Sequence, residues 1–247
     1  MTCEARWARL GVLFGVAPAP EPVDVETLLI DTVREAADHP RLFWVAASWL
    51  CVHHRLVNLR RLGQRLRALP ETAVAGALLS LVDARVPGRP FRGLLAHCRP
   101  VRPPRPLFSE VARSPVLRAK VARAAHPLFR RWGLLQDELS LRPGSVRPTA
   151  WVLQHNPPLR LRALFGADLR AEILATLRTE AMSVAELARR LGATYAATHE
   201  ALSALEAGLL VTARPQGRQK RVALSAPVRR WLDRAPLAAP RLGARTA

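Results

Sequence analysis

Residues 168–225 read DLRAEILATLRTEAMSVAELARRLGATYAATHEALSALEAGLLVTARPQGRQKRVALS, and this run contains signals for three helices followed by a hairpin. Its first residue, Asp168, has a side chain of the type that caps helix N-termini. Apolar residues follow at helical spacing, namely Leu169, Ile173, Leu174 and Leu177. Because this spacing gives one apolar face, it predicts a first helix that packs against a core.

A second helix is predicted from Ser183. Residues 183–186 read SVAE, the form of a capping box, in which the serine and the glutamate each satisfy a backbone N–H at the helix start. The apolar residues behind it are Ala185, Leu187, Ala188 and Leu191. Gly192 stands where a left-handed C-terminal cap would end this helix.

The third helix is predicted to begin at Thr194 and to end at Gly208. One face of this helix carries Thr198, Ala201, Leu202 and Leu205. Residues 209–211 then lead into an extended strand, Gln216-Gly217 is a candidate hairpin turn, and residues 221–224 form the returning strand. This order of elements predicts a winged helix-turn-helix, a domain that usually binds double-stranded DNA. We call residues 211–225 the wing.

The segments LARRLG (187–192) and ALSALEAGLL (201–210), with Thr194 between them, resemble the helix-turn-helix core of bacterial ArsR- and MarR-like winged-helix regulators. The resemblance covers about 60 residues, the size of one small module. The preceding segment NPPLRLRALFG (156–166) is similar to the lead-in of winged-helix proteins from GC-rich bacteria. The resemblance implies that the third helix enters the major groove and that the wing lies along the minor groove or the backbone.

The third helix has candidate DNA contacts but few strong ones. Judged by their position, they are Thr194, Tyr195, His199 and Ser203. No Arg or Lys lies within residues 194–210, and Glu200 would repel phosphates. An Arg or Lys fork on guanine, worth about 1–3 kcal/mol, is therefore not available from this helix. DNA binding remains the favoured interpretation, but sharp reading of a base sequence does not follow from this helix.

The wing provides the basic candidates for DNA contact, which are Arg214, Arg218, Lys220 and Arg221. No acidic residue lies among them. Four cations on a short ribbon suit salt-sensitive contacts with phosphates that do not depend on base sequence. The alternative is a charged turn that only contacts solvent. Because these residues coincide with the wing, we favour phosphate contact.

The charge of the whole chain favours a polyanionic partner. It has 38 basic and 19 acidic residues and a net charge of +19. Such a balance indicates nucleic acid first and an anionic membrane surface second. Since an Arg-rich composition is also typical of GC-rich genomes, the distribution of charge is more informative than the total. Residues 1–40 have a local charge of −4, whereas residues 99–132 have nine basic residues against Glu110 alone, a local charge of +8.

The predicted fold is mainly α. Helices are expected over residues 25–37, 42–53, 56–69 and 72–84, and over 107–139 with breaks at Pro115 and Pro127. The predicted domains are a helical N-terminal domain (1–98), a Pro/Arg-rich linker plus helical segment (99–156), the winged helix-turn-helix (157–233) and a disordered tail (234–247). Tryptophans on apolar faces, at Trp44, Trp49, Trp132 and Trp151, are expected to anchor cores. We interpret the N-terminal helices as a domain for dimerisation or for holding a partner protein.

Signals for enzymatic chemistry are weak, and we expect no enzyme, cofactor or metal. Phosphate-loop, nucleophile-elbow and H-E-x-x-H motifs do not occur in the sequence. The best set of metal-ligand types is Cys51, His53, His54, His97 and Cys98, but these residues are not at zinc-site spacing. Three cysteines, and no apolar run of about 20 residues, favour a cytoplasmic protein that does not span a membrane.

Two functions from different classes stay open. The first is a bacterial transcriptional regulator that binds double-stranded DNA through the winged helix, as a homodimer. The alternative is an interaction protein, such as an antitoxin-like adaptor, in which the winged helix docks a partner protein. The weakly basic third helix favours the alternative, and the four cations of the wing favour DNA binding.

Overall fold

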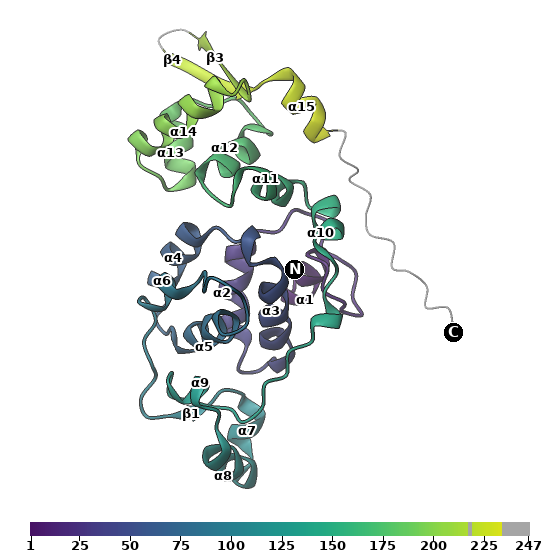
Figure 1. The fold of residues 1–247 in the computed structure, drawn as a ribbon, viewed down its shortest axis with the longest axis vertical. Helices are drawn as coiled ribbons and strands as arrows, with labels where there is room; N and C mark the ends of the chain where they lie inside the picture. The colour runs from purple at the N-terminus through teal and green to yellow at the C-terminus, as the bar shows by residue number, and fades with distance from the viewer. Residues whose placement is uncertain (217–218, 234–247) are drawn as a thin grey trace, which may run out of the picture. The chain divides into compact units, whose positions relative to one another are not determined.

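The computed structural model describes residues 1–216 and 219–233, and the chain divides into two compact units (Figure 1). The first unit is Met1–Trp151 and the second is Val152–Ala247. The boundary therefore lies five residues before the one predicted at 156/157. The predicted tail, 234–247, and Gly217 of the predicted turn lie outside the described residues.

The first unit consists mainly of helices joined by short turns. In chain order its elements are α1 (Cys3–Arg9), α2 (Val25–Glu35), α3 (Pro40–His53), η1 (His54–Leu56), α4 (Leu59–Arg67), α5 (Ala73–Asp83), α6 (Arg92–Leu95), β1 (Arg105–Pro106), α7 (Ser109–Arg113), α8 (Pro115–Ala124), α9 (Pro127–Arg130), β2 (Leu134–Leu135) and η2 (Pro143–Ser145). The helix α10 (Thr149–His155) spans the boundary to the second unit.

The helix α3 forms the centre of the first unit, where it packs against α2 and α5. Its Trp49 is fully buried and lies 5.7 Å from the ring of Trp7 on α1. Both indoles satisfy their N–H groups, since Trp7 donates to the Thr32 hydroxyl (2.8 Å) and Trp49 donates to the Leu10 carbonyl (2.9 Å). The aromatic side chains therefore contribute apolar burial without leaving an unsatisfied donor.

Residues 99–135, predicted as a linker followed by helix, pack within the first unit. The strands β1 and β2 form a parallel pair, and Phe108 and Phe129 pack against Phe43 of α3 at 6.1 and 6.2 Å between ring centroids. Gly133 has φ +70°, and a Cβ there would lie 2.0 Å from the Val101 carbonyl oxygen. The predicted linker is therefore held by backbone pairing and aromatic packing, which local sequence patterns do not reveal.

Residues 141–150, which belong to the predicted linker-plus-helix segment 99–156, also bind α3. The Arg142 backbone N–H donates to the Ser48 hydroxyl (2.8 Å), and Val146 forms an antiparallel bridge with Val12. The buried His53 ring bonds the Arg147 carbonyl through Nε2 (3.0 Å) and the Thr149 hydroxyl through Nδ1 (3.2 Å). Polar groups of α3 thus hold this segment against the core.

The second unit has the predicted order of helices and hairpin. Its elements are α11 (Pro157–Phe165), α12 (Leu169–Leu177), α13 (Val184–Leu191), α14 (Tyr195–Ala207), β3 (Val211–Gln216), β4 (Gln219–Leu224) and α15 (Ala226–Asp233). The expected fold class, a helical N-terminal region followed by a winged helix-turn-helix with a small hairpin, is confirmed.

The predicted helix caps of the second unit are all present. Asp168 accepts from the Arg170 N–H (2.9 Å), and Thr194 accepts from the Ala197 N–H (3.2 Å). Ser183 and Glu186 form the capping box, and Gly192 has the left-handed conformation, with φ +57°. Since each cap involves residues close in sequence, local patterns were sufficient to predict them.

Two features of the second unit were not predicted. The wing gains a third pairing partner, because Met182 and Val222 exchange backbone hydrogen bonds of 3.0 and 2.8 Å. In addition, buried Arg162 of α11 pairs with buried Glu172 of α12 at 2.6 Å. Together they attach the wing and the lead-in helix to α12 and its following loop.

No helix among residues 1–216 and 219–233 is long and apolar enough to cross a membrane.

Candidate nucleic-acid interface

The outer face of α14 presents three of the predicted contact residues. Tyr195, His199 and Ser203 are exposed, whereas Thr198, Leu202 and Leu205 are buried in the core of the second unit. The rings of Tyr195 and His199 stack with centroids 6.2 Å apart, and the Ser203 hydroxyl donates to the His199 carbonyl (3.0 Å). The helix therefore presents an aromatic pair followed by a hydroxyl that bonds its own backbone.

The two threonines at the start of α14 have local roles. The Thr194 side chain is exposed, but its oxygen caps the helix. Thr198 is fully buried, and its hydroxyl donates to the Thr194 carbonyl (2.9 Å). Because this bond satisfies the hydroxyl, a threonine can occupy this core position.

The wing places its cations on both of its faces. In the strand register, Arg214 lies opposite Arg221, and Lys220 lies opposite Pro215. Arg214 and Lys220 are exposed, and neither has an ion-pair partner among the described residues. Arg218 lies outside the described residues. Two directly opposed arginines repel each other unless an anion lies nearby.

Arg221 differs from the other wing cations because it is anchored within the unit. Its Nε and Nη2 donate to the Ala181 carbonyl at 3.2 and 2.8 Å, and its Nη2 lies 3.5 Å from a Glu186 carboxylate oxygen. The same Glu186 oxygen accepts the Ser183 backbone N–H (2.7 Å). Arg221 therefore ties the wing to the start of α13.

The charge of Glu186 is favoured by these neighbours. The Ser183 backbone N–H is the main cause that lowers the pKa of Glu186 below its ordinary value of 4.5, and the Ser183 hydroxyl, Arg221 and Arg189 act in the same direction. The carboxylate thus stays ionised at neutral pH and can balance the charge of Arg221.

Two further arginines near the wing were not predicted as contacts. Arg189 and Arg190 are exposed at the end of α13, and with Arg221 they line a hollow of about 430 Å³. Arg190 pairs with Glu180 at 2.8 Å. Both arginines occur in the LARRLG segment, directly before the turn that leads to α14. Their place in this segment could have indicated that they lie close to the candidate interface.

The comparisons with known proteins concern this same part of the chain. Residues 167–226 match the family model HVO_A0114. The matched segment is about a quarter of the chain and runs from the residue before Asp168 to the first residue of α15. No curated protein and no solved structure matches the chain. The HVO_A0114 segment therefore coincides with the helices α12–α14 and the wing.

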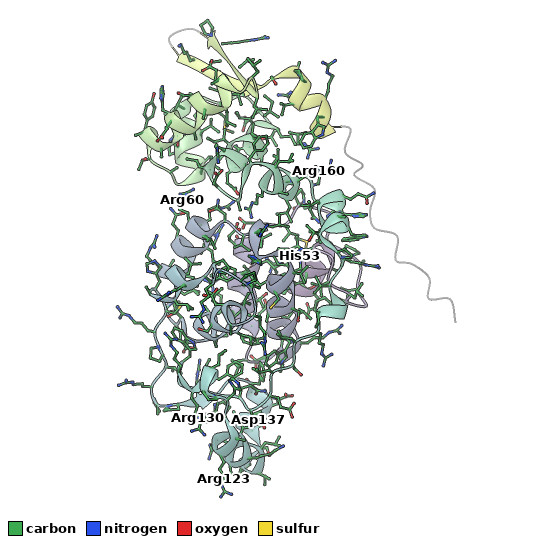
Figure 2. All side chains as sticks on the ribbon, viewed as in Figure 1. His53, Arg60, Arg123, Arg130, Asp137 and Arg160 are labelled. Atoms are coloured by element: carbon green, nitrogen blue, oxygen red, sulfur yellow. The ribbon has the colours of Figure 1, made fainter. Side chains whose placement is uncertain are left out.

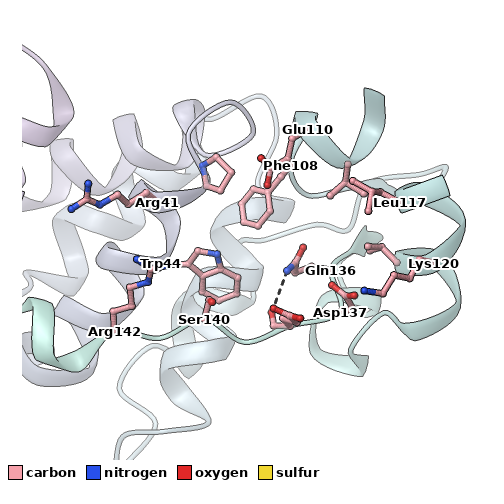
Figure 3. A pocket seen from close by; sticks show the side chains of 14 residues that line it. Arg41, Trp44, Phe108, Glu110, Leu117, Lys120, Gln136, Asp137, Ser140 and Arg142 are labelled. Atoms are coloured by element: carbon pink, nitrogen blue, oxygen red, sulfur yellow. Dashed lines mark hydrogen bonds between the residues drawn. The ribbon is translucent and has the colours of Figure 1, made fainter. Parts of the chain in front are cut away.

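The first unit has a pocket of about 460 Å³ between α3, α7, α8 and residues 136–142 (Figure 3). Trp44 and Phe108 line it with ring centroids 6.0 Å apart, and the Gln136 amide donates to the Glu138 carbonyl (3.3 Å). Its charged lining residues are Arg41, Glu110, Lys120, Asp137, Glu138 and Arg142. The pocket has the size of a small-molecule site, and its charges of both signs favour no single ligand class.

Three of the five metal-ligand types considered in the sequence, His53, His97 and Cys98, have other partners. His53 bonds residues 147 and 149, the His97 ring lies 3.2 Å from the Arg67 guanidinium, and the buried Cys98 thiol donates to the Leu94 carbonyl (3.8 Å). Within the described part of the chain, no three His, Cys, Asp or Glu side chains gather as a metal site requires.

Proposed function

We propose that this chain binds double-stranded DNA through α14 and the wing, without catalysing a reaction. The observation that carries the proposal is the pair of exposed wing cations, Arg214 and Lys220, without ion-pair partners among the described residues. A protruding ribbon with uncompensated cations suits the phosphate backbone. The resemblance to ArsR- and MarR-like regulators supports a role in bacterial transcription, in the cytoplasm, as a homodimer.

In this proposal the two elements contribute differently. The wing contacts phosphates, and Arg189 at the end of α13 adds a cation next to it. Tyr195 and His199 on α14 contact base edges or flanking phosphates, through a phenol that donates to phosphate and a ring N–H that donates to a guanine acceptor. Because α14 has exposed Glu200 and Glu206 and no basic residue, affinity depends mainly on the wing.

A second candidate function is docking of a partner protein on α14. The observation that favours it is the exposure of two large side chains, Tyr195 (58%) at the start of this helix and Leu209 (79%) two residues after its end. Exposed aromatic and aliphatic groups next to acidic residues are more typical of a protein interface than of a phosphate-binding helix.

Binding of the full chain to duplex DNA, measured over salt concentrations from about 50 to 200 mM, separates the two functions. The proposal predicts an association constant whose logarithm falls linearly with the logarithm of the salt concentration. It also predicts enrichment of a preferred site from a randomised DNA pool. Failure to bind any duplex at the lowest salt would reject it and favour docking.

A further inference from the structure

The first unit has a second basic surface, formed by the consecutive helices α7, α8 and α9. Five arginines belong to it, and we call them the α7–α9 patch: Arg113, Arg118, Arg123, Arg130 and Arg131. All five are exposed, and none has an ion-pair partner among the described residues. Figure 2 shows Arg123 and Arg130 at the end of the first unit that these helices form.

The helix α8 is almost entirely open to solvent. Of its ten residues, Val121 alone is buried. The helix is capped at both ends, because the Ser114 hydroxyl accepts from the Leu117 N–H (3.3 Å) and the Arg130 guanidinium donates to the Ala122 and Arg123 carbonyls (2.9 Å each). With one buried side chain and cations on its outside, this helix buries little of its own surface, which leaves that surface available for a partner.

The chemistry of the patch favours phosphate. Residues 99–132 have eight arginines, one lysine and a single acid, Glu110, and Asp137 and Glu138 also lie beside α8, at the pocket that Leu117 and Lys120 line, so the cations of this end outnumber its acids. Guanidinium groups bind phosphate oxygens through two parallel hydrogen bonds, which ammonium groups cannot do. The Arg130 guanidinium donates to two backbone carbonyls, and Arg123 takes part in these contacts only through its carbonyl oxygen. Neither guanidinium therefore has a carboxylate in these contacts to neutralise its charge.

The patch fits nucleic acid better than a lipid surface. Val116 and Leu117 are exposed on α8, which is the feature a membrane surface would use. At about 100° per residue, however, Lys120 lies between these two side chains around the helix axis. The helix therefore has no continuous apolar face to bury in a bilayer.

We infer that the α7–α9 patch is a second binding surface for the DNA phosphate backbone, independent of the wing. The inference rests on the proposed function and adds to it a sequence-independent contact from the first unit. Each neutralised phosphate releases counterions, so the two surfaces add their contributions to the salt dependence of binding.

The test compares three double variants of the full chain by anisotropy on a random duplex. Arg118→Ala with Arg123→Ala removes two patch cations, and Arg214→Ala with Lys220→Ala removes two wing cations. Arg85→Ala with Arg92→Ala is the control, because both residues are exposed cations outside the patch and the wing. Lys120 is left in place because it also lines the pocket of the first unit.

The patch variant is expected to lower the salt slope by about 1–2 units with unchanged circular dichroism, whereas the control keeps the wild-type slope. A wild-type slope in the patch variant, with a lowered slope in the wing variant, overturns the inference and leaves the proposed function standing. A lowered slope in the patch variant with a wild-type slope in the wing variant supports the patch and rejects the wing. If the patch variant lost binding to anionic phospholipid vesicles but kept the wild-type salt slope on DNA, the inference would also be overturned, in favour of a lipid surface.

Discussion

Arg214 and Arg221 lie directly opposite each other in the wing, but among the described residues only Arg221 has a carboxylate neighbour, Glu186 at 3.5 Å. The two arginines therefore have different roles. Arg221 bonds the Ala181 carbonyl and holds the wing on the unit, while Arg214 is directed to solvent and to the proposed phosphate contact.

This difference predicts unequal losses of stability for two matched substitutions. Arg221→Ala removes both donors to the Ala181 carbonyl and should cost about 1–2 kcal/mol of stability. Arg214→Ala should change stability by less than about 0.5 kcal/mol, because the side chain is exposed. Hydrogen exchange at the Val222 amide, which bonds Met182, reports the effect locally. Equal exchange rates in the two variants would contradict the anchoring role of Arg221.

The capping box gives a second prediction about stability. Ser183→Ala removes the oxygen that accepts the Glu186 N–H and should cost roughly 1 kcal/mol. Ser203→Ala is the matched control, because its hydroxyl only donates to a helix carbonyl on the exposed face. Urea unfolding of the full chain measures both. A loss no larger than that of the control would mean that the box does not stabilise α13.

These caps also show how much of the fold the sequence predicted. Caps and apolar faces depend on residues three or four positions apart, so the limits of α12, α13 and α14 followed from local patterns. The anchoring of Arg221 by Ala181 and the packing of Phe108 against Phe43 join residues 40 and 65 positions apart. No spacing rule indicates such pairs. The exposed face of α14 depends on local spacing and was predicted. The anchoring role of Arg221 depends on a distant residue and was not predicted.

The third helix gives a prediction that separates sequence reading from positioning. Tyr195→Ala with His199→Ala removes the stacked aromatic pair on the exposed face of α14. If these rings reach base edges, affinity should fall more for a selected site than for random duplex. Competition between the two DNAs measures the ratio. Equal losses would show that α14 positions the protein without specifying sequence, and release of a partner protein without any DNA effect would favour docking.

The buried His53 predicts a loss of stability on the acid side of neutrality. Burial is the main cause that lowers the pKa of His53 below its ordinary value of 6.5. The folded chain therefore takes up fewer protons than the unfolded chain at this residue. The contribution of neutral His53 to the free energy of unfolding is present above pH 6.5. It is lost as the pH falls through the lower pKa that His53 has in the folded chain.

The thermal midpoint should therefore fall as the pH is lowered from about 7.5 to about 5.5. His53→Gln should reduce this pH dependence. The half-buried ring of His54, whose pKa is also lowered mainly by burial, accounts for part of the remainder. If the variant and the wild type lost stability equally over this range, His53 would not be the titrating group.

The central claim is that the wing binds phosphate, and the salt slope of duplex binding tests it most directly. For Arg214→Ala with Lys220→Ala, the account predicts weaker binding by a similar factor on every duplex and a slope lower by about 1–2 units than that of wild type. The Arg85→Ala, Arg92→Ala control should keep the wild-type slope. An unchanged slope in the wing variant, with wild-type affinity, would contradict the claim and remove the wing from the interface.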